Sequence, residues 1–141
     1  TVRNKKMTFA SGALVFPGGS VDRADTSNAL RPFLPLDSVK WSKREIGWRV
    51  AAVREVYEEA GIKVHKIKYH SSQPWPFPSS LMLGFRAEGI NNKLNVNFSE
   101  LELARWFTKD FLKASPENDS FKMPGKVSIA RRLIEEWINE D

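Results

Sequence analysis

Cysteine is absent from this 141-residue sequence, and histidine occurs only twice. The first absence excludes a disulfide framework and a thiolate metal site. His65 and His70 stand five residues apart, an odd offset that would place them on opposite faces of a strand. They therefore do not form a natural pair of metal ligands, and we expect both to be solvated.

Long apolar runs and the common nucleophile motifs are missing as well. No run approaches the ~20 residues that a membrane span requires, and the N-terminus has no basic segment followed by an apolar one. Neither Gly-x-Ser-x-Gly nor Gly-x4-Gly-Lys-Ser/Thr occurs. We expect one ordinary domain over residues 1–141, in a reducing, cytoplasmic compartment.

The charge balance is basic. There are 22 Lys and Arg against 17 Asp and Glu, which gives a net charge of +5. Such a surface attracts anionic, phosphorylated substrates. The basic residues are scattered rather than gathered in one run, so the sequence allows nucleic-acid binding but does not indicate it.

The most informative segment is Arg54-Glu55-Val56-Tyr57-Glu58-Glu59-Ala60-Gly61-Ile62. Its three glutamates have the i, i+3, i+4 spacing that gathers side chains on one face of a helix. Like charges on one face repel unless a cation lies on them, and hard oxygen ligands suit Mg²⁺ or Mn²⁺. The competing interpretation is the solvated face of an amphipathic helix.

Upstream, the glycine loop Pro17-Gly18-Gly19-Ser20 precedes Asp25. Together with the segment from Arg54 to Ile62, it resembles the signature of the Nudix hydrolase family: Gly, five residues, an acid, seven residues, then Arg-Glu-apolar-x-Glu-Glu-x-Gly-apolar. Gly19 takes the glycine and Asp25 the acid, where the family usually has Glu. Between Asp25 and Arg54 lie 54 − 25 − 1 = 28 residues instead of seven, which indicates an insertion at about residues 26–46.

The pattern of elements is that of an α/β protein. We expect a buried strand at Ala13 to Phe16 and a helix that starts near Lys43 or Arg44 and is stopped by Gly61. Further strands are expected at Val64 to Tyr69, Leu81 to Phe85 and Ala104 to Phe107, with helical segments at Asp110 to Ala114 and after Gly125. The core face of the long helix should carry Ile46, Val50, Val53, Val56, Tyr57 and Ala60. The resemblance implies the Nudix fold, an α/β/α sandwich around a mixed β-sheet.

The resemblance also implies a metal site and catalytic roles. Glu55 and Glu59 would be the principal ligands, assisted by Glu58 and by the Gly18 carbonyl. A further carboxylate would come from Glu100, with Glu102 as the competing choice and an exposed loop acid as the alternative interpretation of both. Arg54 would pair with Glu58 and orient it. For the general base we favour Glu59, but Glu58 and Glu100 remain open, because the base is decided by its distance to the attacking water.

A second motif runs from Ser72 to Met82 as Ser-Gln-Pro-Trp-Pro-Phe-Pro-Ser-Ser-Leu-Met. Alternating prolines hold aromatic side chains in an extended loop, where they could meet a planar base. A proline loop that merely covers the core would look similar. The string resembles the motif of NADH pyrophosphatases within the Nudix family. Carried over by position, Gln73, Trp75, Ser80 and Met82 would contact the dinucleotide, with Ala130 nearby.

The glycine loop and the insertion instead resemble Nudix members of the coenzyme A diphosphatase type. We therefore predict metal-dependent hydrolysis of the pyrophosphate bond of a nucleoside diphosphate derivative, foremost an NAD(H)-type dinucleotide, to AMP and nicotinamide mononucleotide. The alternatives are coenzyme A or acyl-CoA hydrolysis, removal of nucleotide caps from RNA, and a catalytically silent ligand sensor. The resemblance also allows a homodimer, and the abrupt start at Thr1 leads us to expect further sequence upstream.

Overall fold

A long helix, an antiparallel β-hairpin and a helix near the C-terminus make up most of the described part of the protein. The computed structural model describes residues 2–3, 19–27, 34, 38, 40–75, 79–114 and 122–140. In chain order the elements are β1 (Val2–Arg3), η1 (Ala24–Thr26), α1 (Lys43–Ala60), β2 (Val64–Trp75), β3 (Ser80–Gly89), β4 (Leu101–Leu103), α2 (Lys109–Ala114) and α3 (Ile129–Asn139). No helix among the described residues has the length and apolar character needed to cross a membrane.

Helix α1 starts and stops where the sequence predicts. Ser42 and Glu45 form a capping box, in which the Glu45 amide donates to Ser42 Oγ at 3.2 Å and the Ser42 amide donates to Glu45 Oε2 at 2.8 Å. At the other end Gly61 adopts the left-handed conformation (φ 71°) and its N–H donates to the Tyr57 carbonyl. These local interactions fix the segment that carries the glutamates.

The predicted core face of α1 is only partly correct. Ile46 and Ala60 are buried, as expected, and Val50, Val53 and Val56 are half-buried. Tyr57, however, leaves 53% of its surface exposed. Helical spacing determines which residues share a face, but it does not determine how far the covering elements extend along that face.

Strands β2 and β3 form an antiparallel hairpin that is longer than predicted. Their register pairs Gln73 with Met82, Pro74 with Leu81 and Trp75 with Ser80. The pairing thus continues into the segment expected to be a proline loop, because the fixed φ of proline is compatible with an edge strand. The pairing brings most of the second sequence motif to one end of the hairpin.

The strand predicted at Ala104 to Phe107 is wrong in position. The strand β4 ends at Leu103, where it pairs antiparallel with β1; Ala104 is buried just beyond its end. The apolar residues therefore mark the end of a strand and the start of the following loop. The predicted strand at Ala13 to Phe16 lies outside the described residues.

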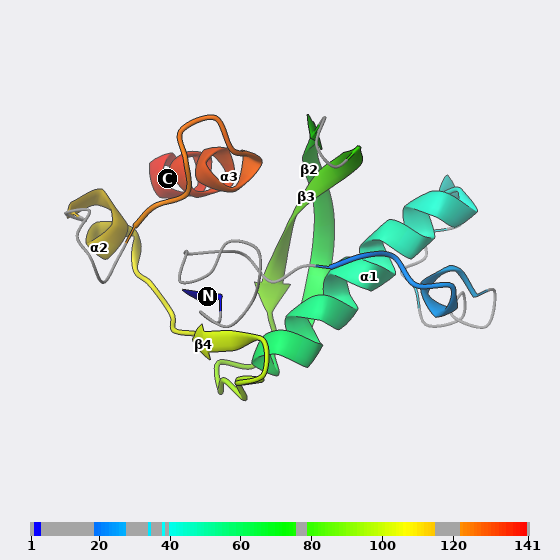
Figure 1. Ribbon diagram of the computed structural model, residues 1–141, viewed down its shortest axis with the longest axis horizontal. Helices are drawn as coiled ribbons and strands as arrows, with labels where there is room; N and C mark the ends of the chain where they lie inside the picture. The colour runs from blue at the N-terminus through cyan, green and yellow to red at the C-terminus, as the bar shows by residue number, and fades with distance from the viewer. Residues whose placement is uncertain are drawn as a thin grey trace.

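The β2–β3 hairpin lies between two helices, as Figure 1 shows, with α1 on one side and α3 on the other. Ile129, Ile134 and Ile138 of α3 and Leu101 of β4 are among the buried apolar residues. This arrangement confirms the α/β class. Both strand pairs within the described residues are antiparallel, so the parallel pairing of a mixed sheet is not seen among them.

Candidate active site

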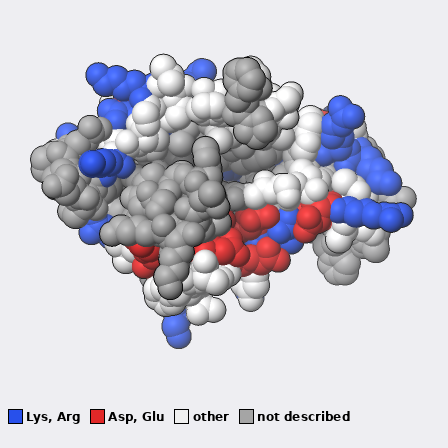
Figure 2. Space-filling view, in the orientation of Figure 1, with Lys and Arg blue, Asp and Glu red and all other residues white. Residues whose placement is uncertain are grey.

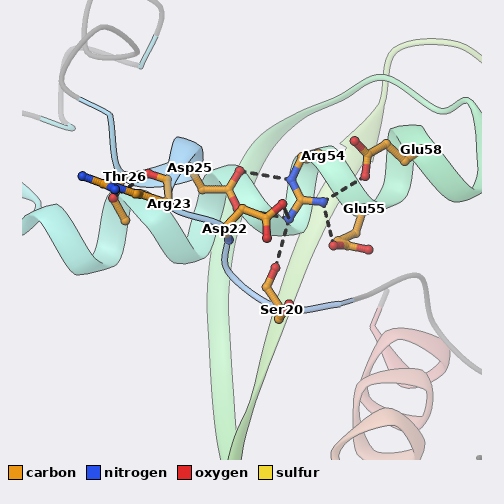
Figure 3. A network of polar contacts seen from close by, with 8 residues as sticks. All are labelled: Ser20, Asp22, Arg23, Asp25, Thr26, Arg54, Glu55 and Glu58. Carbon is orange, nitrogen blue, oxygen red and sulfur yellow. Dashed lines mark hydrogen bonds and ion pairs between the residues drawn. The ribbon is translucent and has the colours of Figure 1, made fainter.

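Arg54 is the centre of a polar network that joins α1 to the segment of residues 20–25 (Figure 3). Its Nε and Nη2 each donate to one carboxylate oxygen of Asp25, both at 3.1 Å, and Nη2 also donates to the Ser20 carbonyl at 3.0 Å. Its Nη1 donates to Glu55 Oε1 at 2.8 Å and to Glu58 Oε2 at 2.9 Å. The predicted pairing of Arg54 with Glu58 is therefore present, as one contact of several.

Asp25 is the buried partner in this network, with only 2% of its surface exposed. Burial by itself raises the pKa of a carboxyl, but the hydrogen bonds and charge of Arg54 and the Asp22 amide outweigh it and lower the pKa of Asp25 below its usual value. The same contacts raise the pKa of Arg54. Asp25, the acid of the family signature, thus holds the side chain of Arg54 in place. The signal in the sequence was that a guanidinium with five donors needs more acceptors than Glu58 supplies.

The Glu55 carboxylate lies directly against the backbone of Gly19. A Cβ placed on Gly19 would be 2.4 Å from Glu55 Oε1, 2.5 Å from Cδ and 2.6 Å from Oε2. Only glycine leaves room for this approach. Gly19 therefore leaves the space that the head of the first glutamate occupies, and we call this contact the Gly19 cradle.

The three glutamates differ in exposure. At about 100° per residue, Glu58, Glu55 and Glu59 lie in that order across an arc of about 100° on α1. The exposed fraction falls along this arc. It is 52% for the Glu58 side chain, 13% for the Glu55 side chain and 1% for Glu59. The metal face predicted from spacing is therefore graded from solvent to interior, which spacing alone could not reveal.

The described residues contain no set of three Asp, Glu or His side chains placed closely enough to hold a metal ion. Arg54 Nη1 takes one oxygen each from Glu55 and Glu58. The donor chemistry nevertheless fits a hard divalent cation, because an ionised carboxylate has two acceptor oxygens and the Gly19 cradle holds one such group beside the backbone. The predicted Gly18 ligand lies outside the described residues.

Glu100 is connected through Asn97 to the C-terminal end of α1, which carries the three glutamates. The Asn97 side-chain amide donates to Glu100 Oε1 at 3.2 Å, and the Asn97 backbone N–H donates to the Glu59 carbonyl at 2.8 Å. Glu102 is exposed on β4. These contacts place Glu100 near the end of the carboxylate helix, and its role as a ligand remains a prediction.

The predicted dinucleotide residues share one end of the hairpin. Residues paired across antiparallel strands lie on the same face, as do residues two apart on one strand. Gln73, Trp75, Ser80 and Met82 therefore lie on one face of β2–β3. Trp75 and Met82 are among the exposed large apolar residues. They have the accessible apolar surface that contact with a base requires.

Gln73 also makes contacts that the sequence did not predict. Its Nε2 donates to the Val127 carbonyl and its Oε1 accepts from the Ile129 N–H, both at 2.8 Å. The amide therefore joins the hairpin to the start of α3, where Ser128 caps the helix. Its partner Ile129 directly precedes Ala130, the other predicted substrate residue, and the two bonds give Gln73 a structural role.

His70 departs from the expectation of a solvated histidine. Its Nε2 is 2.5 Å from Glu136 Oε2 on α3, and its Nδ1 is 2.6 Å from Ser71 Oγ. Arg86 and Arg132 also contact Glu136. This cluster joins the hairpin to α3, and His70 and Glu136 are 66 positions apart, so no local signal in the sequence predicted their contact. His65 is exposed, at 3.6 Å from Glu88.

Comparison with known proteins adds an independent finding. The family profile described as a NUDIX domain matches residues 2–124. The chain is 42% identical over 91 residues to a protein of Macaca fascicularis named NAD-capped RNA hydrolase NUDT12, and 41% identical over 91 residues to the human protein of that name. It is 41% identical over 100 residues to NAD-capped RNA hydrolase NudC of Mycobacterium bovis.

These alignments cover 62% to 64% of the chain. They cover much less of the relatives, namely 20% of the NUDT12 proteins and 32% of NudC. The chain thus spans between a fifth and a third of the length of these relatives.

Proposed function

Because the chain belongs to the Nudix hydrolase family, we propose that it hydrolyses the pyrophosphate bond of an NAD(H)-type dinucleotide and releases AMP and nicotinamide mononucleotide. The observation that carries this proposal is the junction of α1 and the glycine loop, where the Glu55 carboxylate lies against Gly19. Pyrophosphate hydrolysis needs oxygen ligands for a cation next to a closely approachable backbone. The contact between Glu55 and Gly19 supports the proposal because it brings a carboxylate of the glutamate helix to such a backbone.

Nudix hydrolases generally need divalent metal ions, and we propose Mg²⁺ or Mn²⁺. Glu55, Glu58 and Glu59, with the Gly18 carbonyl and Glu100, would hold them. When bound, such ions offset the charge of phosphoryl oxygens and lower the pKa of coordinated water. Arg54 has a separate role, because its contacts to Asp25 and Ser20 hold the segment of residues 20–25 at a fixed place relative to the helix.

Glu59 is the residue we propose as general base. It follows Glu58 on α1 and is turned inward from the exposed end of the carboxylate arc. A carboxylate with little solvent around it has few orientations available, so it can hold one proton-accepting geometry. Glu58 and Glu100 are the competing candidates for the base, because both are more accessible to solvent, and so to an attacking water, than Glu59.

The substrate assignment has two supports. One is the hairpin face of Gln73, Trp75, Ser80 and Met82, which presents exposed apolar surface beside the start of α3. The other is the similarity to proteins named NAD-capped RNA hydrolases. We therefore propose that the dinucleotide can be free or can form the 5′ end of an RNA.

A substrate panel tests this assignment. Turnover of NADH, NAD⁺, ADP-ribose, diadenosine polyphosphates, coenzyme A and 5′-NAD-capped RNA should be compared with Mg²⁺ or Mn²⁺ present. We expect NADH, NAD⁺ and the capped RNA to have the highest kcat/KM. Efficient cleavage of coenzyme A without cleavage of NADH would overturn the assignment and favour the resemblance carried by the glycine loop.

We also propose a homodimer, on the ground of the family resemblance alone. Sedimentation velocity over a range of protein concentrations tests this proposal. A single species with the mass of one chain at all concentrations would contradict it.

A further inference from the structure

Four exposed cations gather where η1 meets the start of α1. They are Arg23, Lys40, Lys43 and Arg44. Lys43 and Arg44 are the first two residues of α1, Lys40 is three residues earlier, and Arg23 immediately precedes η1. Thr26 and Val21 pack against Gly47, one turn after Lys43 and Arg44. This packing brings the two short segments together, and we call the four residues the basic cluster.

The basic cluster adjoins the acidic site. Figure 2 shows Lys and Arg at the right-hand end of the band of Asp and Glu side chains, and in Figure 3 the side chain of Arg23 extends away from Arg54 along the first half of α1. Lys43 and Arg54 are 54 − 43 = 11 residues apart on α1, about 16 Å along the axis at 1.5 Å per residue. That distance is longer than one pyrophosphate but suits a chain of successive phosphates.

These cations are not used in the described part of the fold. No ion pair joins any of the four to another residue that the structure describes. The arginines near α3 differ, because Arg86, Arg131 and Arg132 all pair with glutamates of the last turns of the chain. Among the described residues, these three arginines are therefore paired, whereas the four cations of the basic cluster are not.

Helix stability does not account for the cluster either. The macrodipole makes the N-terminus of a helix unfavourable for Lys and Arg, yet Lys43 and Arg44 occupy its first two positions. The acid of the first turn, Glu45, is engaged in the capping box. Residues that act against a local preference are expected at functional positions.

We propose that the basic cluster binds the phosphodiester backbone of an RNA whose 5′ dinucleotide enters the active site. This inference rests on the proposed function, because the acidic site must take the pyrophosphate for the RNA to continue along α1. The interval between Asp25 and Arg54 is longer than the usual Nudix spacing. Arg23 and Lys40 lie on either side of residues 26–39, which make up most of the extra length. The proposed RNA path thus rests on the described residues at the two ends of that segment.

The test compares two variants with equal loss of charge. The first combines Arg23→Gln, Lys40→Gln, Lys43→Gln and Arg44→Gln. The control combines Lys63→Gln, Lys68→Gln, Lys93→Gln and Lys113→Gln, four exposed lysines elsewhere. Binding of a short unstructured 5′-NAD-capped RNA is measured by fluorescence anisotropy over a range of salt concentrations in EDTA, which stops turnover, and kcat/KM for NADH is measured separately.

We expect the cluster variant to bind the RNA at least ~10-fold more weakly, with the slope of log K against log salt reduced by about 3, since each lost contact to single-stranded RNA accounts for roughly 0.7. Its kcat/KM for NADH should equal that of the wild type. Equal loss of binding in both variants, or no loss in either, would overturn the inference. If the wild type cleaves no dinucleotide, the proposed function fails, while the difference in binding still decides whether this surface takes RNA.

Discussion

The carboxylate of Glu55 occupies the space that a side chain at residue 19 would need. The closest approach is 2.4 Å, between Oε1 and the position of a Cβ on Gly19. The obstructing atoms are the far end of a flexible side chain, so Gly19→Ala can be accommodated when Glu55 rotates away. The fold should tolerate the substitution, and the site should not.

We therefore predict that Gly19→Ala lowers kcat for NADH about 100-fold, the effect expected when a catalytic group is displaced by about 1 Å. The unfolding free energy should change little. Gly125→Ala is the matched control, because nothing lies within 4 Å of the Cβ it would add. Steady-state kinetics and urea unfolding of both variants measure the two effects. Full activity of Gly19→Ala would contradict the proposal that the contact between Glu55 and Gly19 positions the carboxylate for catalysis.

The two aspartates that contact Arg54 should differ in their effect on stability. Asp25→Asn leaves the arginine without its buried partner and should lower the unfolding free energy by roughly 3 kcal/mol. Asp22 is 62% exposed and 3.6 Å from Nη2, so Asp22→Asn should cost less than ~1 kcal/mol. Denaturant unfolding measures both, and equal effects would show that burial of Asp25 is not what matters.

Gly61 should be intolerant of any side chain. Its φ of 71° disfavours other residues, and an added Cβ would be 2.6 Å from the Asn95 Cβ and 3.0 Å from the Asn95 backbone nitrogen. Left-handed backbone alone costs about 1–2 kcal/mol for a residue with a Cβ, and the contact with Asn95 adds to it. We predict a loss of at least that size for Gly61→Ala in thermal and urea unfolding. An unchanged transition midpoint would refute it.

The contact between His70 and Glu136 should appear in the pH dependence of stability. Hydrogen bonds from His70 and Arg132 lower the pKa of Glu136 from 4.5 to about 2. A carboxyl with a lowered folded pKa stabilises the protein above its unfolded pKa, and this stabilisation is lost as pH falls through the folded value. The stability gap between wild type and Glu136→Gln should thus be full above about pH 5 and disappear towards pH 2.

Unfolding by urea at a series of pH values measures this gap. Glu135→Gln is the matched control, since Glu135 lies on the same helix and pairs only with Arg131 among the contacts described. The same pH profile for both variants would show that His70 has no part in the effect.

Local features of the fold could be predicted from sequence. The start of α1 and its glycine stop depend on a capping box and a left-handed residue, which involve neighbours in the chain. The pairing of Arg54 with Glu58 follows from helical spacing. The family signature named the right segment because its residues are consecutive.

Features that depend on distant contacts could not be predicted. The burial of Glu59 depends on the elements that cover α1. The link from Gln73 to Val127 and Ile129 spans more than 50 residues, as does that from His70 to Glu136. Such contacts depend on how α3 packs against the hairpin. For this reason the sequence assigned Gln73 to the substrate but not to the fold.

The central claim is that the carboxylates of α1 drive pyrophosphate hydrolysis of a dinucleotide, and Glu59→Gln tests it most directly. The products of NADH with Mg²⁺ or Mn²⁺ should be resolved by chromatography for the wild type and for the variant, with urea unfolding to verify the fold of both. We predict AMP and reduced nicotinamide mononucleotide from the wild type, none in EDTA, and at least a ~100-fold lower rate for the folded variant. Undiminished turnover by Glu59→Gln would contradict the proposed role of this residue, and absence of AMP from the wild type would contradict the account as a whole.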